Sequence, residues 1–297
     1  MTATATRVQA APTPSRPARP RRSLFWTASL VLTAVLVGWA AVGLDAKWER
    51  LISAPADMWR LAQLMFGNMT WSDVGRLLDA MWDSIAIAWL GTMLAAAVAV
   101  PLAFLAARNL GGTLVSLVIR QCFNMLRALP EVILVIAFIP IFGLSLNAGV
   151  LAIAIGSIGT LGKLCAEILE GLDDGPLEAA DAAGANRLQR LRWGVLPQAL
   201  PELMSFVLYR FEINIRVSAV LGAVGAGGIG GTLVNALSFN EFGVAGLALI
   251  IVVLGTIAVD MISGWVRRRI IAGPRSERRH GDVAPDALAA DALTATL

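Results

Sequence analysis

The stretch Ile85–Ala107, IAIAWLGTMLAAAVAVPLAFLAA, decides the fold class of this chain. It contains no charged residue, and its length suits a membrane-spanning helix, because about 20 apolar residues rising 1.5 Å each cross a hydrocarbon core of about 30 Å. The sequence therefore predicts an all-α, polytopic membrane protein with six transmembrane helices. The other five mostly apolar runs are Leu24–Leu44, Leu129–Leu144, Ala148–Leu169, Leu203–Leu221 and Val244–Val266.

The composition agrees with a chain that lives in lipid. Hydrophobic residues make up 57% and charged residues 15% of the 297 residues, and the mean hydropathy is +0.71. A soluble domain has roughly 45–50% apolar and about 25% charged residues. The two cysteines, Cys122 and Cys165, and the single histidine, His280, lack the spacing of metal ligands. The sequence thus predicts neither a metal site nor a Cys/His catalytic site.

The first apolar run has two interpretations. Two arginines precede it, and Ala41-Val42-Gly43 resembles the cleavage site of a signal peptide. Its length of about 21 residues exceeds the 7–15 residues of a signal core and favours an uncleaved helix. The segment before it, 1–22, is rich in Pro, Ala, Thr and Arg and is predicted to be disordered. The segment after it, Asp45–Asp83, carries four tryptophans and is predicted to form short amphipathic helices at the outer interface.

The placement of basic residues predicts the orientation, because Lys and Arg are retained on the cytoplasmic side. Like the N-terminal tail, the segments 108–127, 187–192 and 267–279 are arginine-rich. The alternate connections, Ser145–Asn147 and Ala223–Gly243, contain neither Lys nor Arg. Both termini are therefore predicted to lie in the cytoplasm of a cell with this chain in its inner or plasma membrane.

The segment Gly171–Pro201 is the most informative polar stretch. Pro176 suits the first turn of a helix, and Glu178 suits its positive end. Gly184 interrupts this pattern, and a second, basic helix is predicted from Asn186 to Trp193, ending before Leu196-Pro197. The pattern indicates a helix–turn–helix against the membrane, although composition alone favours an ordinary connecting loop.

This segment resembles the EAA loop of ABC importer permeases. Gly194 departs from the pattern, because the family has an aliphatic residue there. The downstream stretches Tyr209–Arg216, Val220–Gly222 and Gly225–Gly230 resemble the phosphonate-uptake branch of these permeases, with support from Pro101–Asn109 and Leu126–Glu131. The residues that carry the EAA resemblance are Glu178, Ala179, Ala180, Gly184, Leu196 and Pro197.

The resemblance implies a type I ABC importer permease fold for 85–270, with the coupling loop at 171–201. The other predicted segments are the tails 1–22 and 271–297 and, at 23–84, the first helix with the outer amphipathic segment. The loop is implied to insert into a groove on an ATP-hydrolysing subunit. The implied partners are a second permease copy, two cytoplasmic ABC ATPase subunits that bind ATP and Mg, a periplasmic or lipid-anchored phosphonate-binding protein, and membrane lipids.

The implied cargo is a phosphonate or a related phosphorus oxyanion, phosphate and phosphite included. The chain itself is expected to bind no cofactor and no nucleic acid, and to break no bond in the cargo. Two alternatives stay open. One is an importer for another small solute such as methionine, since the loop motif is shared across importers. The other is an intramembrane enzyme acting on lipid phosphates through Arg210, Glu212 and Asp260.

The fifth apolar run carries an unusual set of polar residues: Arg210, Glu212, Asn214 and Arg216. At 3.6 residues per turn, Glu212 and Arg216 share one face, and Arg210 and Asn214 share a nearly opposite one. Such groups either pair inside the protein or line a substrate path, where an arginine fork suits an oxyanion. Asp260 is a candidate partner for one arginine, and Ser218 is grouped with the same candidate path.

Two further patterns concern glycine and lysine. Gly225–Gly230 formally matches G-x-G-x-x-G, but no strand or βαβ unit surrounds it, so a dinucleotide site is excluded. Close packing or a re-entrant turn is predicted there instead. The sequence has no G-x-x-x-x-G-K-[ST], so ATP must be hydrolysed by another polypeptide. Lys163 and Glu167 are predicted to form a surface ion pair. The glycines expected to allow close packing are Gly222, Gly225, Gly227, Gly228 and Gly230.

Overall fold

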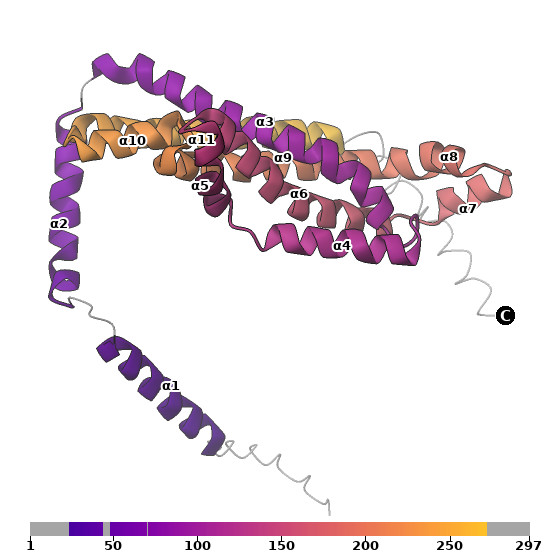
Figure 1. Cartoon of the computed structure of the whole chain (residues 1–297), viewed down its shortest axis with the longest axis horizontal. Helices are drawn as coiled ribbons and strands as arrows, with labels where there is room; N and C mark the ends of the chain where they lie inside the picture. The colour runs from indigo at the N-terminus through magenta and orange to yellow at the C-terminus, as the bar shows by residue number, and fades with distance from the viewer. Residues whose placement is uncertain (1–23, 44–47, 70, 272–297) are drawn as a thin grey trace, which may run out of the picture. The chain divides into compact units, whose positions relative to one another are not determined.

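The computed structural model describes residues 24–43, 48–69 and 71–271. The predicted tails, including His280, lie outside these residues except for Ile271. The described residues form helices and connecting turns with no strand among them, which confirms the predicted all-α class (Figure 1). The chain divides into two compact units, Met1–Met58 and Trp59–Leu297.

The first unit holds α1 and the beginning of α2. The apolar part of α1, Trp26–Ala41, is shorter than the other candidate spans. Helix α2 contains Pro55, and it is one helix rather than the predicted set of short ones. The bounds of these helices are α1 Leu24–Gly43 and α2 Trp48–Gly67.

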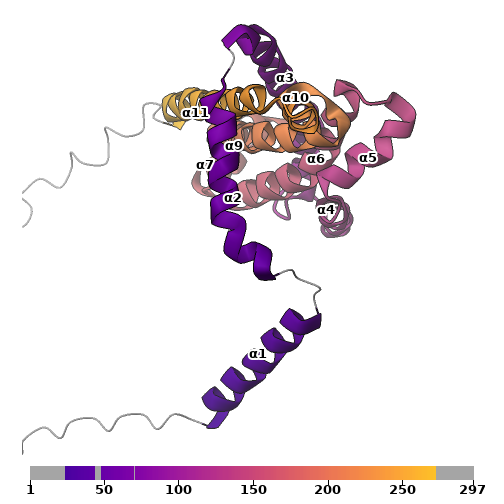
Figure 2. The ribbon, with the colours of Figure 1, turned by 90° about the vertical axis from the view of Figure 1, so that its left-hand side faces the viewer.

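The second unit is a bundle built around α6. Helix α6 packs against α3, α4, α5 and α9, and in the end-on view it lies among its neighbours with α4 and α5 along one side (Figure 2). The bounds are α3 Val74–Ala106, α4 Thr113–Arg127, α5 Glu131–Phe142, α6 Leu146–Glu170, α7 Gly175–Ala182, α8 Arg187–Arg190, α9 Leu196–Leu221, α10 Gly228–Ser238 and α11 Phe242–Ile271.

The predicted count of six spans is not confirmed. Among the described residues, three helical segments are long and apolar enough to cross a membrane by themselves: Trp71–Ala106, Leu146–Glu170 and Phe242–Ile270. Two bent pairs raise the count to five if each pair is one span. These pairs are α4 with α5, bent by 82°, and Arg187–Ala226 with α10, bent by 55°.

Helix α3 begins earlier than its apolar run indicated. The prediction placed its start at Ile85, whereas the helix starts at Val74. Its first three turns carry charged residues, but Leu77, Met81 and Ser84 are buried at the spacing of one helical face. The start of α3 therefore follows its stripe of buried residues, which begins before the run that lacks charged residues.

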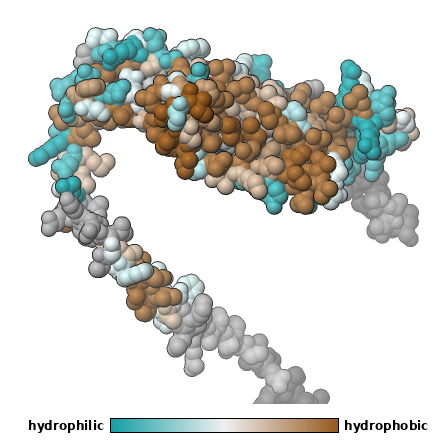
Figure 3. All heavy atoms as spheres, viewed as in Figure 1, coloured by the Kyte–Doolittle hydropathy of each residue, from teal (hydrophilic) through white to brown (hydrophobic). Residues whose placement is uncertain are grey.

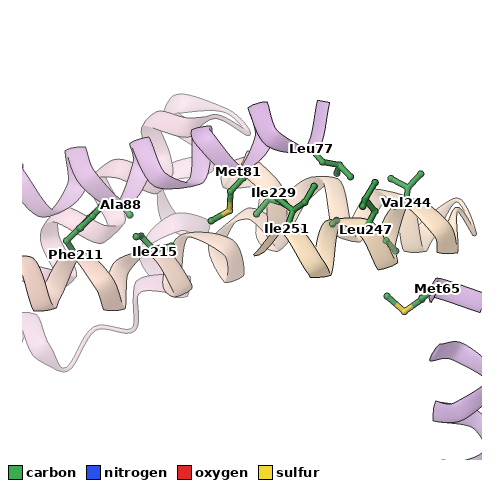
Figure 4. Close-up of a cluster of buried hydrophobic side chains, with 13 residues drawn as sticks. Met65, Leu77, Met81, Ala88, Phe211, Ile215, Ile229, Val244, Leu247 and Ile251 are labelled. Carbon is green, nitrogen blue, oxygen red and sulfur yellow. The ribbon is translucent and has the colours of Figure 1, made fainter. Parts of the chain in front are cut away.

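Buried clusters join the helices along the bundle. In one of them, Met81 of α3, Ile229 of α10 and Ile251 of α11 lie close together (Figure 4). Small residues allow this close packing: a Cβ added at Gly162 of α6 would collide with the ring of Phe123 on α4. Small residues on α6 therefore determine how closely neighbouring helices approach it.

The outer surface of the second unit is apolar along its middle and polar at its ends. The view in Figure 3 shows hydrophobic residues gathered over the middle of the bundle and hydrophilic residues at both ends. An exposed apolar band of this kind suits contact with lipid. Exposed apolar residues of α3 and α11 include Leu90, Leu94, Val98, Val253, Leu254 and Ile257.

Candidate functional site

The first candidate site is the polar loop at one end of the bundle, where α7 and α8 lie (Figure 1). As predicted, α7 has Pro176 in its first turn. Leu177 points inward and is 3% exposed, while the neighbouring Glu178 and Ala179 are exposed. The helix thus anchors itself through one leucine and presents its acidic face outward.

The turn between α7 and α8 is closed by specific contacts. Gly184 adopts a φ of +74°, a left-handed conformation that glycine takes without strain. Asn186 caps α8: its side chain accepts from the Gln189 backbone N–H, and the Gln189 side chain accepts from the Asn186 N–H, both at 2.9 Å. An ion pair of 3.4 Å between Arg190 and Asp181 ties α8 back to α7.

The predicted end of the second helix before Leu196-Pro197 is wrong. A π-helical turn at Leu191–Val195 joins α8 to α9, so that helical backbone continues from Arg187. Pro197 lies in the first turn of α9, and because it has no N–H it leaves one gap in the hydrogen bonds that continue from the π-helical turn. The proline therefore sits inside a continuous helical segment instead of terminating one.

Gly194, the departure from the family pattern, lies buried under α7. A Cβ at this position would lie 3.5 Å from the carbonyl oxygen of Pro176, which is ordinary van der Waals contact. The Gln198 side chain donates to the Gly194 carbonyl at 2.8 Å. The π-helical turn thus lies against the start of α7, and a small side chain such as alanine would also fit at this position.

The loop packs against the ends of four bundle helices. Leu177 belongs to one buried cluster with residues of α3, α4, α6 and α9. Because this cluster is closely packed, a displacement of α7 must shift these helix ends with it. The cluster members that Leu177 joins include Ala106, Phe123, Cys165, Leu169, Val195, Ala199 and Leu203.

The second candidate site lies in the middle of α9, where Arg210 and Asn214 share one face. The Arg210 guanidinium donates from Nη2 to Glu131 Oε1 at 2.8 Å and from Nε to Ser157 Oγ at 3.1 Å. The Asn214 amide donates to Thr92 Oγ1 at 2.8 Å and to Ser157 Oγ at 3.0 Å. Arg210 and Asn214 therefore meet through the shared hydroxyl of Ser157.

This cluster is deeply buried on its inner side. The side chains of Asn214, Ser157 and Thr92 are 0% exposed, while those of Arg210 and Glu131 are 12% and 27% exposed. Buried polar groups of this kind are stable only when their hydrogen bonds are satisfied. Every polar group of the inner side has a partner here.

The other face of α9 pairs with α11 instead of within itself. Glu212 and Arg216 share a face as predicted, but the Glu212 carboxylate accepts from Arg267 at 2.5 Å and Arg216 donates to Asp260 at 2.8 Å. Asp260 thus forms an ion pair with one of the two arginines. Helix α11 offers the opposite charge to each residue, so interhelical pairs replace the intrahelical one.

Ser218 and the glycines lie at the α9–α10 junction. The Ser218 hydroxyl is 2.9 Å from the Ser84 carbonyl oxygen, and the Ser84 hydroxyl accepts from the Ile229 N–H at 3.0 Å. A Cβ at Gly222 would collide with the Gly227 carbonyl oxygen, and one at Gly228 with the Ser84 hydroxyl. The predicted close packing by these glycines agrees with this geometry, and it extends to Gly225, Gly227 and Gly230.

Two further expectations can be compared with the described residues. Lys163 and Glu167 form the predicted pair, at 3.8 Å. In residues 24–43, 48–69 and 71–271, no group of three or more His, Cys, Asp or Glu is placed to hold a metal ion.

Sequence reasoning missed the partners of the α9 residues. Glu131 follows Pro130 and looked like an ordinary acidic residue in the first turn of a helix. Ser157 and Thr92 are hydroxyl residues within mostly apolar stretches, and no periodic pattern marks them. Arg267 looked like part of the basic segment after the last span. Their common property, contact with α9, depends on helix packing that one sequence does not display.

Comparison with known proteins places this architecture in a family. The family described as "Binding-protein-dependent transport system inner membrane component" matches residues 99–272. The putative phosphite transport system permease protein HtxC of Stutzerimonas stutzeri is 34% identical over 84% of this chain and 88% of its own length. The phosphate-import permease protein PhnE of Mycolicibacterium smegmatis is 38% identical over 66% of this chain but only 37% of its own length.

A solved structure has the same fold. The inward-facing MetNI methionine ABC transporter contains a chain that superposes with a TM-score of 0.60, covering 68% of this chain and 99% of that one, at 22% identity. This confirms the predicted type I importer permease fold. Family and relatives are transport permeases and not enzymes. The chain belongs to the binding-protein-dependent transport system inner membrane component family, the membrane-embedded permease subunits of ABC importers.

Proposed function

We propose that this chain is the permease of an ATP-driven importer that carries a phosphonate or a related phosphorus oxyanion, phosphate and phosphite included, into the cytoplasm. The observation that carries the proposal is the α7–α8 loop, packed through Leu177 onto the buried ends of the bundle helices. A loop that only connected two spans would not need this anchoring. The permeases named above, for phosphite in one case and phosphate in the other, support the cargo class.

In the proposed assembly two copies of the chain surround a central path. Two cytoplasmic ATPase subunits bind ATP and Mg and receive the loop in a groove, so both termini of the permease lie in the cytoplasm. A periplasmic or lipid-anchored binding protein delivers the cargo to the outer face. Closure of the ATPase subunits displaces α7, and the packed cluster around Leu177 passes that displacement to α3, α6 and α9.

The proposed contact for the cargo is Arg210. Its guanidinium fork can bind two oxygens of an oxyanion at once. Its side chain is 12% exposed, against 56% for Arg216, which pairs with α11. A cargo contact needs shielding from water to be selective, because electrostatic attraction is weak in water. The Glu212 and Arg216 face therefore serves to hold α9 on α11.

Replacement of Glu178 by Arg tests the coupling. Glu178 is exposed on α7, beside the buried anchor Leu177, so its replacement leaves the fold intact but reverses the charge offered to the ATPase groove. In proteoliposomes that hold the full complex, we expect Glu178→Arg to abolish ATP-driven uptake and to lower the amount of ATPase subunit that co-purifies.

The matched control is Asp79→Arg. Asp79 is also an exposed acid, but it lies far from the loop. Along α3 it is separated from Ala106, a member of the Leu177 cluster, by about 40 Å of helix at 1.5 Å per residue. This variant is expected to retain the ATPase subunit at the wild-type level. Normal uptake and normal retention by Glu178→Arg would rule out the proposed role of the loop.

A further inference from the structure

The contacts of Arg210 divide into a buried side and a more exposed side. On the buried side, its Nε donates to Ser157, whose hydroxyl also accepts from Asn214. On the other side, Nη2 donates to Glu131, whose side chain is 27% exposed. Glu131 can therefore leave Arg210 without breaking the hydrogen bonds of the buried side.

Glu131 stands at a joint in the chain. It is the first residue of α5 and follows Pro130, whose backbone is extended at a ψ of 134°. Helices α4 and α5 are bent by 82° at this joint. Proline has no N–H to continue a helix, so the joint can change its angle while α4 and α5 keep their own hydrogen bonds. A change of this angle moves Glu131 relative to Arg210.

Gly156 of α6 makes the room that Glu131 occupies. A Cβ at Gly156 would lie 2.6 Å from Glu131 Cγ, closer than such atoms approach one another, and 3.1 Å from Glu131 Oε1, which is a tight contact. Gly156 is adjacent to Ser157, so one turn of α6 supplies both the space for the carboxylate and a hydroxyl for Arg210. The position of the carboxylate is thus shaped by α6 as well as by charge.

We propose that Glu131 is a surrogate anion: it occupies the place of the cargo on Arg210 and is displaced when the oxyanion arrives. This inference rests on the proposed function and names the residue that competes with the cargo. A carboxylate and a phosphorus oxyanion both present two oxygens to a guanidinium, so they compete for the same N–H groups. Between transport events Glu131 neutralises a guanidinium that would be costly to bury alone.

The exchange keeps the charge near Arg210 balanced. When the oxyanion binds, its negative charge replaces that of Glu131, and the released carboxylate turns toward the more exposed side. An uncharged solute cannot make this exchange, because it would leave the guanidinium without a counter-ion. Glu131 would therefore select for anionic cargo and also hasten its release by reclaiming Arg210.

The pair of Arg216 and Asp260 provides a matched control. It joins an arginine of the same helix to an acid at the same N–O distance, 2.8 Å. Asp260 lies inside the continuous helix α11 rather than at a joint. The side chains of Arg216 and Asp260 are both more than a third exposed. Replacement of Asp260 by Asn removes one acid from an α9 arginine without touching the Glu131 position.

The test uses the full complex of permease and ATPase subunits in nanodiscs, without the binding protein, and radiolabelled phosphate and methylphosphonate as probes. We expect Glu131→Gln to bind either probe about ten-fold more tightly than wild type. In wild type the ion pair between Glu131 and Arg210 competes with the probe and lowers its apparent affinity, and this competition is lost in the variant. Gly156→Ala should act in the same direction, because it expels the carboxylate while keeping its charge. Asp260→Asn should match wild type. With the binding protein restored, Glu131→Gln should lower the maximal uptake rate.

The outcomes separate this inference from the proposed function. If wild-type complex imports the probes but Glu131→Gln binds them no more tightly than Asp260→Asn, the surrogate role is wrong and the proposed function stands. If Glu131→Gln fails to assemble while Asp260→Asn assembles, Glu131 is a structural counter-ion, which also overturns the inference. A wild-type complex that imports no phosphorus oxyanion overturns both.

Discussion

Ser218 and Ser263 are two buried serines with opposite surroundings. The Ser218 hydroxyl lies 2.9 Å from the Ser84 carbonyl oxygen and 2.8 Å from that of Ile215. Ser263 is 3% exposed, and its hydroxyl has no partner among the described residues. A bonded hydroxyl stabilises the fold, whereas an unbonded buried one has lost its hydration without compensation.

These surroundings predict different effects of substitution by alanine. Ser218→Ala should lower the free energy of unfolding by about 0.5–1.5 kcal/mol, because the hydrogen bond of the buried hydroxyl is lost. Ser263→Ala should leave it unchanged or raise it. The midpoint of thermal unfolding of the purified complex in detergent measures both. Equal losses from the two substitutions would contradict the assigned hydrogen bonds.

At the residue scale, the sequence predicted which side chains of α9 matter but not what they contact. Helical spacing placed Arg210 with Asn214 and Glu212 with Arg216. The contacts lie 79 residues away for Arg210, in Glu131, and 55 residues away for Glu212, in Arg267. Spacing along one helix cannot reveal such partners, because they depend on how separate helices pack.

The junction between α9 and α10 is closely packed. Gly225 has a φ of +108°, which a residue with a Cβ adopts only under strain. A Cβ at Gly230 would collide with the carbonyl oxygen of Ala219 in the preceding helix. The end of α9 and the start of α10 therefore touch backbone to backbone, which fixes the 55° bend between them.

Substitution of alanine for glycine should separate packed from open positions. Gly230→Ala should destabilise the complex by about 1–3 kcal/mol, because backbone atoms must move apart. Gly75→Ala, in the first turn of α3, meets nothing within 4 Å and should stabilise by up to about 1 kcal/mol through helix propensity. Retention of monodisperse complex after graded heating compares the two, and equal retention would contradict the close junction.

At the element scale, the sequence predicted helices better than their ends. The apolar run after Pro130 became α5, and the arginine-containing segment before it became a separate helix, α4. The start of α3 was missed because charged residues occupy the outer face of its first turns, and the start of α9 was missed because Pro197, Pro201 and Glu202 precede its apolar run. The π-helical turn at Leu191–Val195 was also missed, since prolines at 197 and 201 suggested a break rather than a continuous helix.

For the whole second unit, α9 connects the two candidate sites. Pro197 in its first turn belongs to the loop, and Arg210 lies 13 residues later, or about 20 Å along the helix. Under the proposed function, this helix would carry a displacement received through the Leu177 cluster to Arg210. Helix α9 thus runs from the α7–α8 loop, past Arg210, to the glycine junction with α10.

At this scale the family was predictable and the assembly was not. The motif at Glu178–Pro197 and the apolar runs identified a permease, and the family match confirms it. The number of spans was not predictable from apolar runs, because the run Leu129–Leu144 forms only the short helix α5, which makes one span with α4 if the bent pair is counted together. Contacts with a second copy or an ATPase subunit involve surfaces that a single chain does not show.

The most direct test of the account is ATP-driven uptake by proteoliposomes that hold permease, ATPase subunits and binding protein. Labelled methylphosphonate should accumulate only with ATP, should be competed by phosphate or phosphite but not by methionine, and should be lost in Arg210→Gln. Uptake of methionine with no uptake of methylphosphonate, or wild-type oxyanion uptake by Arg210→Gln, would contradict the claim that this chain moves a phosphorus oxyanion past Arg210.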